Sequence, residues 1–347
     1  MYGKVKHKGL ILSVIISILF SCNDPASESL EINGNTQGTT YTIIVTEQNS
    51  RLGKAKIDSL LLVFDGSLSS YIESSIISVL NKTEDSILIS DPSGYFKKCF
   101  EISSHIFKTT NGAFDPSVYP LVEGWGFREN NKTPLNEYEV DSILNFVSFE
   151  QDLHYRIKFS EDSIKFTKRH KQFQIDFNAV AQGLAVDEVA SFLIDIGVEN
   201  YYIEIGGEIV VKGRNREGED WKIGVDLPKE NLANRKLENI INITDRAIAT
   251  SGNYRNYYVN DGIKYAHTIN PKSGFPVRHS LLSVTVIAND CASADAYATA
   301  FMVMGKEKTI EFIESHPEEN LEVYLLFADA HGAIKREMSP GFDKYLK

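Results

Sequence analysis

Stretches with the pattern of β-strands outnumber long helical stretches in this chain, and the two kinds do not alternate strictly. Runs that are β-branched, alternating or largely apolar predict strands over 39–46, 155–159, 163–166, 201–211, 281–288 and 321–327. Two more strands, 241–260 and 263–269, are expected to pair as a hairpin whose turn is the Asp-Gly sequence at 261–262. A doubly wound parallel sheet requires regular alternation of strands and helices. The order of elements therefore favours an α+β fold with mixed or antiparallel sheets and packed helices.

Apolar residues at helical spacing predict the helices that pack on these sheets. A first helix is expected around Ile57, Leu61 and Phe64, and the others over 100–110, 187–196, 292–304 and 306–314. The Asn-Gly pair at 111–112 is expected to end the second helix, because both residues tolerate the left-handed conformation found at helix ends.

Charge and cysteine content exclude several classes of protein. The chain has 347 residues, of which 47 are acidic and 36 basic, giving a formal net charge of −11. A surface that binds nucleic acid needs clustered excess Lys and Arg, so no nucleic-acid partner is expected. Three cysteines are too few for a disulfide scaffold or a Cys-rich zinc site.

The N-terminus has the parts of an export signal. Lys4, Lys6 and Lys8 precede the apolar run 9–20, and Cys22 follows a small residue. The apolar run is shorter than the ~20 residues that span a bilayer. A Cys at this position resembles the lipobox of bacterial lipoproteins, in which that Cys becomes acylated. A plain signal peptide with an accidental Cys, or a short membrane anchor, is the alternative.

These features predict three parts of the chain. Residues 1–21 would be a lipoprotein signal peptide, residues 22–36 a lipidated polar tether, and residues 37–347 a catalytic domain. The protein is then expected outside the cytoplasm, held by its lipid at the periplasmic face of the inner membrane.

Asp295 and Thr299 form a candidate site for a hard cation. They lie four residues apart in the predicted helix 292–304, so both oxygens project from one face. A carboxylate and a hydroxyl suit Mg²⁺, which prefers oxygen ligands. On spacing alone, a helix-capping Asp and a Thr bonded to its own helix remain the more common arrangement.

His267 is the candidate general base. It lies in the predicted strand 263–269, where Tyr265 and Ile269 would share its face. A lone His in a strand is more often structural than catalytic, but its ordinary pKa suits proton transfer near neutral pH.

Glycine combines with polar residues in several short segments. Glycine allows a ligand or a second backbone to approach closely. Each segment alone is a weak signal, and Gly206-Gly207 within a strand pattern would by itself predict a β-bulge.

Taken in order, these segments resemble the FAD:protein FMN transferase (ApbE) family. The resemblance rests on seven segments: Q-G-T-T-Y (37–41), A-F-D-P with W-G-F (113–116, 125–127), the run from Asp176 through Gln182-Gly183 to Asp187, E-I-G-G-E (204–208), A-T-S-G-N-Y-R (249–255), A-H-T-I-N-P-K-S-G-F-P (266–276), and Ala294-Asp295 through Ala298-Thr299-Ala300. They extend from residue 37 to residue 300.

The resemblance implies an activity and a fold. Such an enzyme cleaves the diphosphate of FAD, releases AMP and attaches FMN through a phosphoester to a Thr or Ser of an acceptor protein. The acceptors implied are subunits of sodium-pumping NADH:quinone oxidoreductases, Rnf-type complexes and related extracytoplasmic electron-transfer proteins. The implied architecture is ApbE-like and related to the tunnelling fold.

The resemblance also implies site residues. FAD would contact Gln37, Tyr71, Ala113, Phe114, Asp115, Asp176, Gln182 and Ile269. Mg²⁺ would be held by the carbonyl of Ala179 and the side chains of Asp295 and Thr299. His267 would activate the acceptor hydroxyl, so that His267 and Asp295 are the expected catalytic residues.

Four positions depart from the family pattern. Gln37 replaces Met, Gln182 replaces Lys, Asn270 replaces Asp, and Ala298 stands where some members have a second acid. An amide at 182 donates hydrogen bonds but lacks the charge that attracts a phosphate. Two other functions use the same residues: a FAD pyrophosphatase that yields FMN and AMP, and a non-catalytic flavin-binding lipoprotein.

Overall fold

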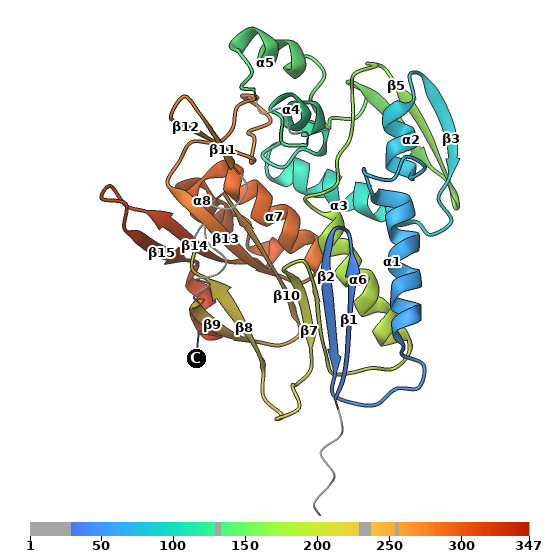
Figure 1. Cartoon of the computed structure of the whole chain (residues 1–347), viewed down its shortest axis with the longest axis vertical. Helices are drawn as coiled ribbons and strands as arrows, with labels where there is room; N and C mark the ends of the chain where they lie inside the picture. Colours follow the sequence, from blue (N-terminus) through green and yellow to red (C-terminus); the bar gives the residue numbers. More distant parts are fainter. Residues whose placement is uncertain (1–28, 129–132, 229–236, 254–256, 347) are drawn as a thin grey trace, which may run out of the picture.

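The centre of the protein is an eight-stranded antiparallel sheet. The structure, a computed structural model, describes residues 29–128, 133–228, 237–253 and 257–346. In spatial order the strands are β1 (Leu30–Thr36), β2 (Thr39–Val45), β6 (Tyr201–Ile205), β7 (Glu208–Lys212), β10 (Arg246–Gly252), β13 (Leu281–Ala288), β14 (Glu322–Ala328) and β15 (Ile334–Met338) (Figure 1). Every neighbouring pair in this sheet is antiparallel.

Three smaller antiparallel sheets complete the β-structure. They are β3 (Ser86–Ser90) with β5 (Ser163–Lys168) and β4 (Tyr155–Phe159), β8 (Trp221–Asp226) with β9 (Leu237–Ile243), and β11 (Tyr257–Asn260) with β12 (Ile263–Ala266). The expected α+β class with antiparallel sheets is therefore confirmed.

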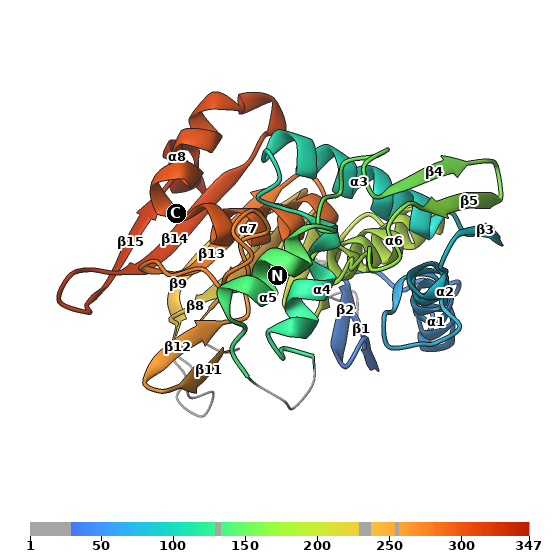
Figure 2. The same ribbon diagram turned by 90° about the horizontal axis from the view of Figure 1, so that it is seen from above.

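Eight α-helices are described alongside these sheets. They are α1 (Lys54–Leu68), α2 (Ile76–Lys82), α3 (Tyr95–Thr109), α4 (Tyr119–Gly124), α5 (Glu137–Leu144), α6 (Ala181–Asp195), α7 (Cys291–Met304) and α8 (Lys306–Ser315). Viewed from above, α1 and α2 lie with the β3–β5–β4 sheet at one end of the molecule, and α8 lies with β15 at the other (Figure 2).

The two faces of the central sheet bury different side chains. Ala247 and Ala249 of β10 point into the main core, which also contains α6 and α7, whereas Ile248 points into a second core with β8 and β9. Alternation of this kind follows from the two-residue repeat of a strand. It identifies which residues of β7 and β10 face the helices.

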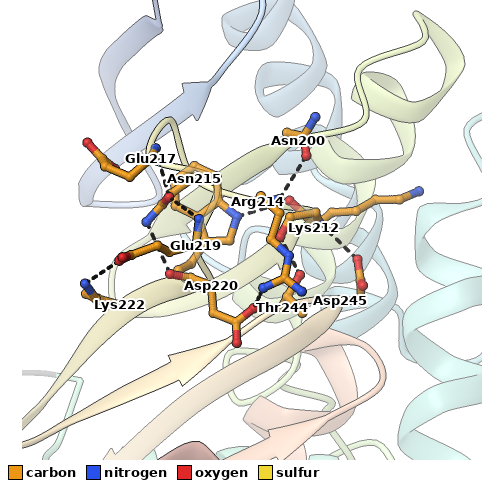
Figure 3. Close-up of polar contacts among 12 residues, drawn as sticks. Asn200, Lys212, Arg214, Asn215, Glu217, Glu219, Asp220, Lys222, Thr244 and Asp245 are labelled. Atoms are coloured by element: carbon orange, nitrogen blue, oxygen red, sulfur yellow. Dashed lines mark hydrogen bonds and ion pairs between the residues drawn. The ribbon is translucent and has the colours of Figure 1, made fainter. Parts of the chain in front are cut away.

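The loop after β7 is fixed by a network of polar contacts. Arg214 N donates to Asn200 Oδ1 at 2.8 Å, and Gly213 N donates to Asp245 Oδ1 at 3.0 Å (Figure 3). Asn215 Oδ1 accepts from two backbone amides of the following turn. These contacts hold β7 at Lys212, the end of the strand opposite to Glu208.

Helix α7 is almost wholly buried between the sheet and α6. It begins after Asp290, whose side chain accepts from Ser293 N at 2.8 Å, and ends at Gly305, where φ is 80°. Gly183 of α6 faces its first turn, and a Cβ added to Gly183 would lie 2.3 Å from the carbonyl oxygen of Cys291. Only glycine permits this approach of the two helices.

We expect Gly183→Ala to lower the free energy of unfolding by about 1–3 kcal/mol, because the new methyl would overlap backbone that cannot move aside. Gly66→Ala is the matched control. Gly66 is an exposed residue of α1 with no atom within 4 Å of an added Cβ, so alanine should stabilise by about 0.5–1 kcal/mol. Urea unfolding measures both. Equal stability of Gly183→Ala and the parent would contradict the tight contact.

Several expected elements are confirmed with small changes in their bounds. The strand 281–288 is β13, the helix 292–304 is α7 beginning one residue earlier, and the hairpin turn at 261–262 joins β11 to β12. The helices expected over 100–110 and 187–196 begin earlier, at Tyr95 and Ala181.

Other expectations were wrong. Residues 30–36, placed in the tether, form β1, because Leu30 and Ile32 pack inward while the segment pairs with β2. Gly206 and Gly207 are not a bulge: their φ angles of 65° and 116° make the turn of a hairpin between β6 and β7. Residues 241–260 are not one strand but parts of β9, β10 and β11.

The predicted signal peptide (1–21) and the predicted lipidation site Cys22 lie outside the described residues. Across the part of the chain that is described, no helix is both long and apolar enough to cross a bilayer. Cys99 and Cys291 are both buried and are free thiols.

Candidate functional site

A cavity of about 380 Å³ gathers most of the residues expected at the site. Eleven of them line it: Tyr71, Ala113, Phe114, Asp115, Asp176, Ala179, Gln182, His267, Ile269, Asp295 and Thr299. They come from separate helices and loops, and the fold brings them together. The cavity is therefore the candidate binding site, although the role of each residue stays a prediction.

Gln37 lies beside this cavity and not in it. It occupies the turn between β1 and β2 with a φ of 51°, and lines an adjoining hollow of about 700 Å³. Tyr71, Asn178 and Gln182 line both spaces. A dinucleotide that extended from one space into the other could reach Gln37.

Helix α7 presents Asp295 and Thr299 to the cavity. Asp295 Oδ2 accepts from Gly183 N at 3.3 Å, and the close approach at Gly183 allows this bond. Thr299 Oγ1 lies 3.2 Å from Ser251 Oγ of β10. Asp295 does not cap the helix, because Asp290 does so.

Glu208, the first residue of β7, adds a second carboxylate to this part of the cavity. Glu208 Oε2 is inaccessible to solvent and has no hydrogen-bond partner in the described structure, although the residue as a whole is half-buried. Burial raises the pKa of Asp295 to about 7. Burial, together with the charge of Asp295, also raises the pKa of Glu208.

The oxygen atoms at this point fit a hard cation. Asp295, Glu208, Thr299 and Ser251 all line the cavity, as does Ala179, which has a backbone carbonyl. Within the described ranges no group of three or more His, Cys, Asp or Glu side chains could hold a metal. Carboxylate, hydroxyl and carbonyl oxygens suit Mg²⁺ better than a transition metal. Such an ion would provide a partner for Glu208 Oε2, which is inaccessible to solvent and has no hydrogen-bond partner in the described structure.

Arg128 is the one Lys or Arg among the described residues that line the cavity. Its guanidinium lies 4.6 Å from the ring centre of Tyr71 and 4.7 Å from that of Tyr119. It donates to Ser70 Oγ at 2.9 Å and lies 4.0 Å from Asp176 Oδ2. Only 14% of its side chain is exposed, so the contacts hold the cation at a fixed place.

Two further carboxylates are fixed by backbone amides. Asp176 Oδ1 accepts from Asn178 N at 2.8 Å; burial raises the pKa of Asp176, and Arg128 opposes this shift. Asp115 accepts from Ser117 N at 2.8 Å and caps a 3₁₀ helix over Pro116–Val118. Burial raises the pKa of Asp115 to about 6. Acidic side chains therefore outnumber Lys and Arg among the described residues that line the cavity.

The sequence predicted that His267 lies in a strand. In the structure it lies in a bend just after β12. Tyr265 packs against Trp125 and Tyr258, whereas His267 lines the cavity, where its ring centre lies 6.5 Å from that of Phe127. Trp125 Nε1 donates to the carbonyl of Gly274 at 2.8 Å. This bond fastens the loop that carries His267 and Ile269.

Arg128, Glu208 and Ser251 are among the cavity residues that were not identified as site residues from the sequence. Glu208 and Ser251 belong to segments already noted for glycine, and Arg128 directly follows Trp125-Gly126-Phe127. Their position inside or beside these segments was the one feature of the sequence that could have identified them as site residues. Which of their side chains face the cavity depends on the fold.

Comparison with known proteins gives a consistent result. The sequence model of the ApbE family matches residues 37–325. A Vibrio cholerae protein named FAD:protein FMN transferase is 33% identical, covering 97% of this chain and 98% of the relative, and a protein of that name from Haemophilus influenzae is 29% identical, with 95% of each covered.

Solved structures are similar as well. The flavin transferase ApbE from Vibrio cholerae matches with a TM-score of 0.78 and 31% identity, over 92% of this chain and 100% of that one. The apo form of the flavinyl transferase ApbE from Pseudomonas stutzeri matches with a TM-score of 0.79 and 27% identity, over 92% and 97%.

Proposed function

Because the chain belongs to the ApbE family, we propose that it transfers FMN from FAD to a Thr or Ser hydroxyl of another protein and releases AMP. The observation that carries this proposal is the single cavity lined by eleven of the expected residues. We further propose that transfer requires Mg²⁺, held by the side chains of Asp295 and Thr299 and the carbonyl of Ala179. When bound, the ion neutralises charge on the diphosphate of FAD.

The reaction exchanges one phosphorus–oxygen bond for another. The acceptor oxygen forms a bond to the phosphorus on the FMN side of the diphosphate, while the bond from that phosphorus to the bridging oxygen breaks and AMP leaves. We propose that His267 takes the proton of the acceptor hydroxyl. Its place on the cavity wall supports this role, because a base must reach the hydroxyl it deprotonates.

Arg128 supports binding of the substrate's negative charge. Gln182 lacks the charge that the family pattern has at this position, and Arg128 is a fixed cation on the same cavity wall. An Arg can form two parallel hydrogen bonds to a phosphate, which gives both energy and orientation. Arg128 is therefore suited to replace the missing lysine.

We expect Arg128→Ala to raise the Kd for FAD about tenfold, because the substitution removes one charge-assisted hydrogen bond to the substrate. Arg156→Ala serves as control, because Arg156 is an exposed residue of β4 that lies outside the cavity. Titration of FAD followed by flavin fluorescence measures both affinities. Unchanged affinity in Arg128→Ala would exclude Arg128 from the substrate site.

We propose that the acceptor is an extracytoplasmic electron-transfer protein of the sodium-pumping NADH:quinone oxidoreductase or Rnf type. The enzyme would be anchored to the membrane by a lipid on Cys22, at the periplasmic face of the inner membrane. The basic and apolar N-terminal segment supports export. Metabolic labelling with a fatty acid, compared between the parent and Cys22→Ser, tests the lipid anchor.

A mixture of the protein, FAD, Mg²⁺ and an acceptor domain tests the transfer. We expect yellow fluorescence to remain on the acceptor after denaturing electrophoresis, and to be lost when a chelator is added. Release of free FMN and AMP without labelled acceptor would instead identify a pyrophosphatase. Tightly bound but intact FAD would identify a flavin-binding protein without catalysis.

A further inference from the structure

We propose that Glu208 is a second carboxylate ligand of the cation, in addition to Asp295. The proposal deepens the Mg²⁺-dependent function proposed above and rests on it. Glu208 lies outside the set of metal ligands that the family resemblance implies.

The hairpin between β6 and β7 fixes the backbone of Glu208. Ile205 pairs with Glu208 across the two-glycine turn, and Gly207 N donates to Glu204 Oε1 at 2.7 Å. Gln182 Nε2 donates to the carbonyl of Ile205 at 3.1 Å and so joins α6 to this turn. Glu208 therefore begins its strand at a defined position beside the cavity.

The sheet directs Glu208 toward the helices. Residues 208 and 210 share one face of β7, and Val210 packs against the core that contains α6 and α7. Ser251 shares a face of β10 with Ala247 and Ala249, which belong to the same core. Because β7 pairs with β10, the oxygens of Glu208 and Ser251 lie on the face that α7 covers.

Helix α7 packs on this face of the sheet and contacts both β7 and β10. Cys291 Sγ contacts the carbonyl of Ile209 at 3.6 Å, which ties the start of α7 to β7. Thr299 contacts Ser251 at 3.2 Å, which ties a later turn of α7 to β10. Asp295 lies between these two contacts along the helix, on the side that lines the cavity with Glu208.

No Lys or Arg among the described residues that line the cavity forms an ion pair with Glu208 or Asp295. Glu208 Oε2 has neither solvent nor a hydrogen-bond partner, and Arg128, the basic residue of the cavity wall, lies beside Asp176. A solvent-inaccessible carboxylate oxygen without a hydrogen-bond partner is unfavourable. A divalent cation held by Glu208 and Asp295 would supply both the missing positive charge and a partner for the unpaired oxygen.

The test measures binding of Mn²⁺, a spectroscopic substitute for Mg²⁺, to the whole protein without FAD. The electron paramagnetic resonance signal of free Mn²⁺ disappears as the ion binds, so a titration gives the Kd. We expect Glu208→Gln, which keeps the shape of the side chain and removes its charge, to raise the Kd at least about tenfold. Asp295→Asn should raise it at least as much.

Glu204→Gln is the matched control. Glu204 is three residues before Gly207 in the same hairpin, does not line the cavity, and keeps its contact with Gly207 N through the amide oxygen. The Kd of Glu204→Gln for Mn²⁺ should stay close to that of the parent and far below that of Glu208→Gln. Circular dichroism and thermal melting check that all variants fold.

The possible outcomes separate two kinds of failure. A Kd for Glu208→Gln equal to that of Glu204→Gln would overturn the role of Glu208 and leave the proposed function untouched. Flavin transfer by the parent protein in the presence of a strong chelator would instead overturn the Mg²⁺ requirement, and with it this proposal. A tenfold difference between the two glutamine variants supports Glu208 as a ligand.

Discussion

Replacement of His267 by alanine should lower the rate of FMN transfer by about 10²–10⁴, the usual contribution of a general base. The imidazole lines the cavity from a loop that Trp125 and Gly274 hold in place, so its removal should leave the cavity otherwise intact. The Kd for FAD should stay close to that of the parent. Transfer is followed by acceptor fluorescence at saturating FAD, and binding by flavin fluorescence.

His331→Ala provides the control for this change. His331 is exposed in the turn between β14 and β15, away from the residues that line the cavity. Its replacement should alter neither rate nor affinity. In a His267→Gly variant, added imidazole should restore part of the lost rate, which a purely structural histidine would not explain. Near-normal transfer by His267→Ala would remove His267 from the mechanism.

Asp295→Asn should lower Mg²⁺-dependent transfer by about 10³ at ordinary magnesium concentrations, because removal of a group that stabilises developing charge costs several kcal/mol. Asparagine keeps the size of the side chain and an oxygen that can accept from Gly183 N. The loss should therefore come from weaker metal binding and not from unfolding. The measurement is the initial rate of acceptor labelling as a function of Mg²⁺ concentration.

Asp162→Asn is a suitable control, because Asp162 is an exposed residue of the turn between β4 and β5. Its dependence on Mg²⁺ should match that of the parent. If Asp295→Asn also showed the parent's rate and the parent's Mg²⁺ dependence, Asp295 would not be a metal ligand.

The parts of the fold that depend on local pattern were predictable from the sequence. The mostly apolar run 281–288 forms β13, and the alanine-rich run before Gly305 forms α7. The Asp-Gly pair at 261–262 adopts positive φ angles of 49° and 75°, as the expected hairpin turn requires.

Elements that depend on distant partners were not predictable. Residues 30–36 contain Asn and Gly, which disfavour strands, and they form β1 because β2 provides a partner. Helix α4 has six residues, including Pro120, too few to show a helical period. β8 was not expected, and it pairs with β9, of which only residues 241–243 lay within the predicted strand 241–260.

The candidate site shows the same division. The resemblance to a family supplied eleven of the residues that line the cavity, whereas Gln37, also expected there, lies in the adjoining hollow. Arg128 and Glu208 were missed because their importance depends on which groups surround them. Glu208 is notable only when its solvent-inaccessible, unpartnered oxygen is seen beside Asp295.

The central claim is that a side-chain hydroxyl of a second protein displaces AMP from FAD. The most direct test is intact-mass spectrometry of an acceptor domain incubated with the protein, FAD and Mg²⁺. We predict a mass increase of one FMN less one water, located on a Thr or Ser, with one AMP released per labelled acceptor. AMP release with an acceptor of unchanged mass would contradict the claim.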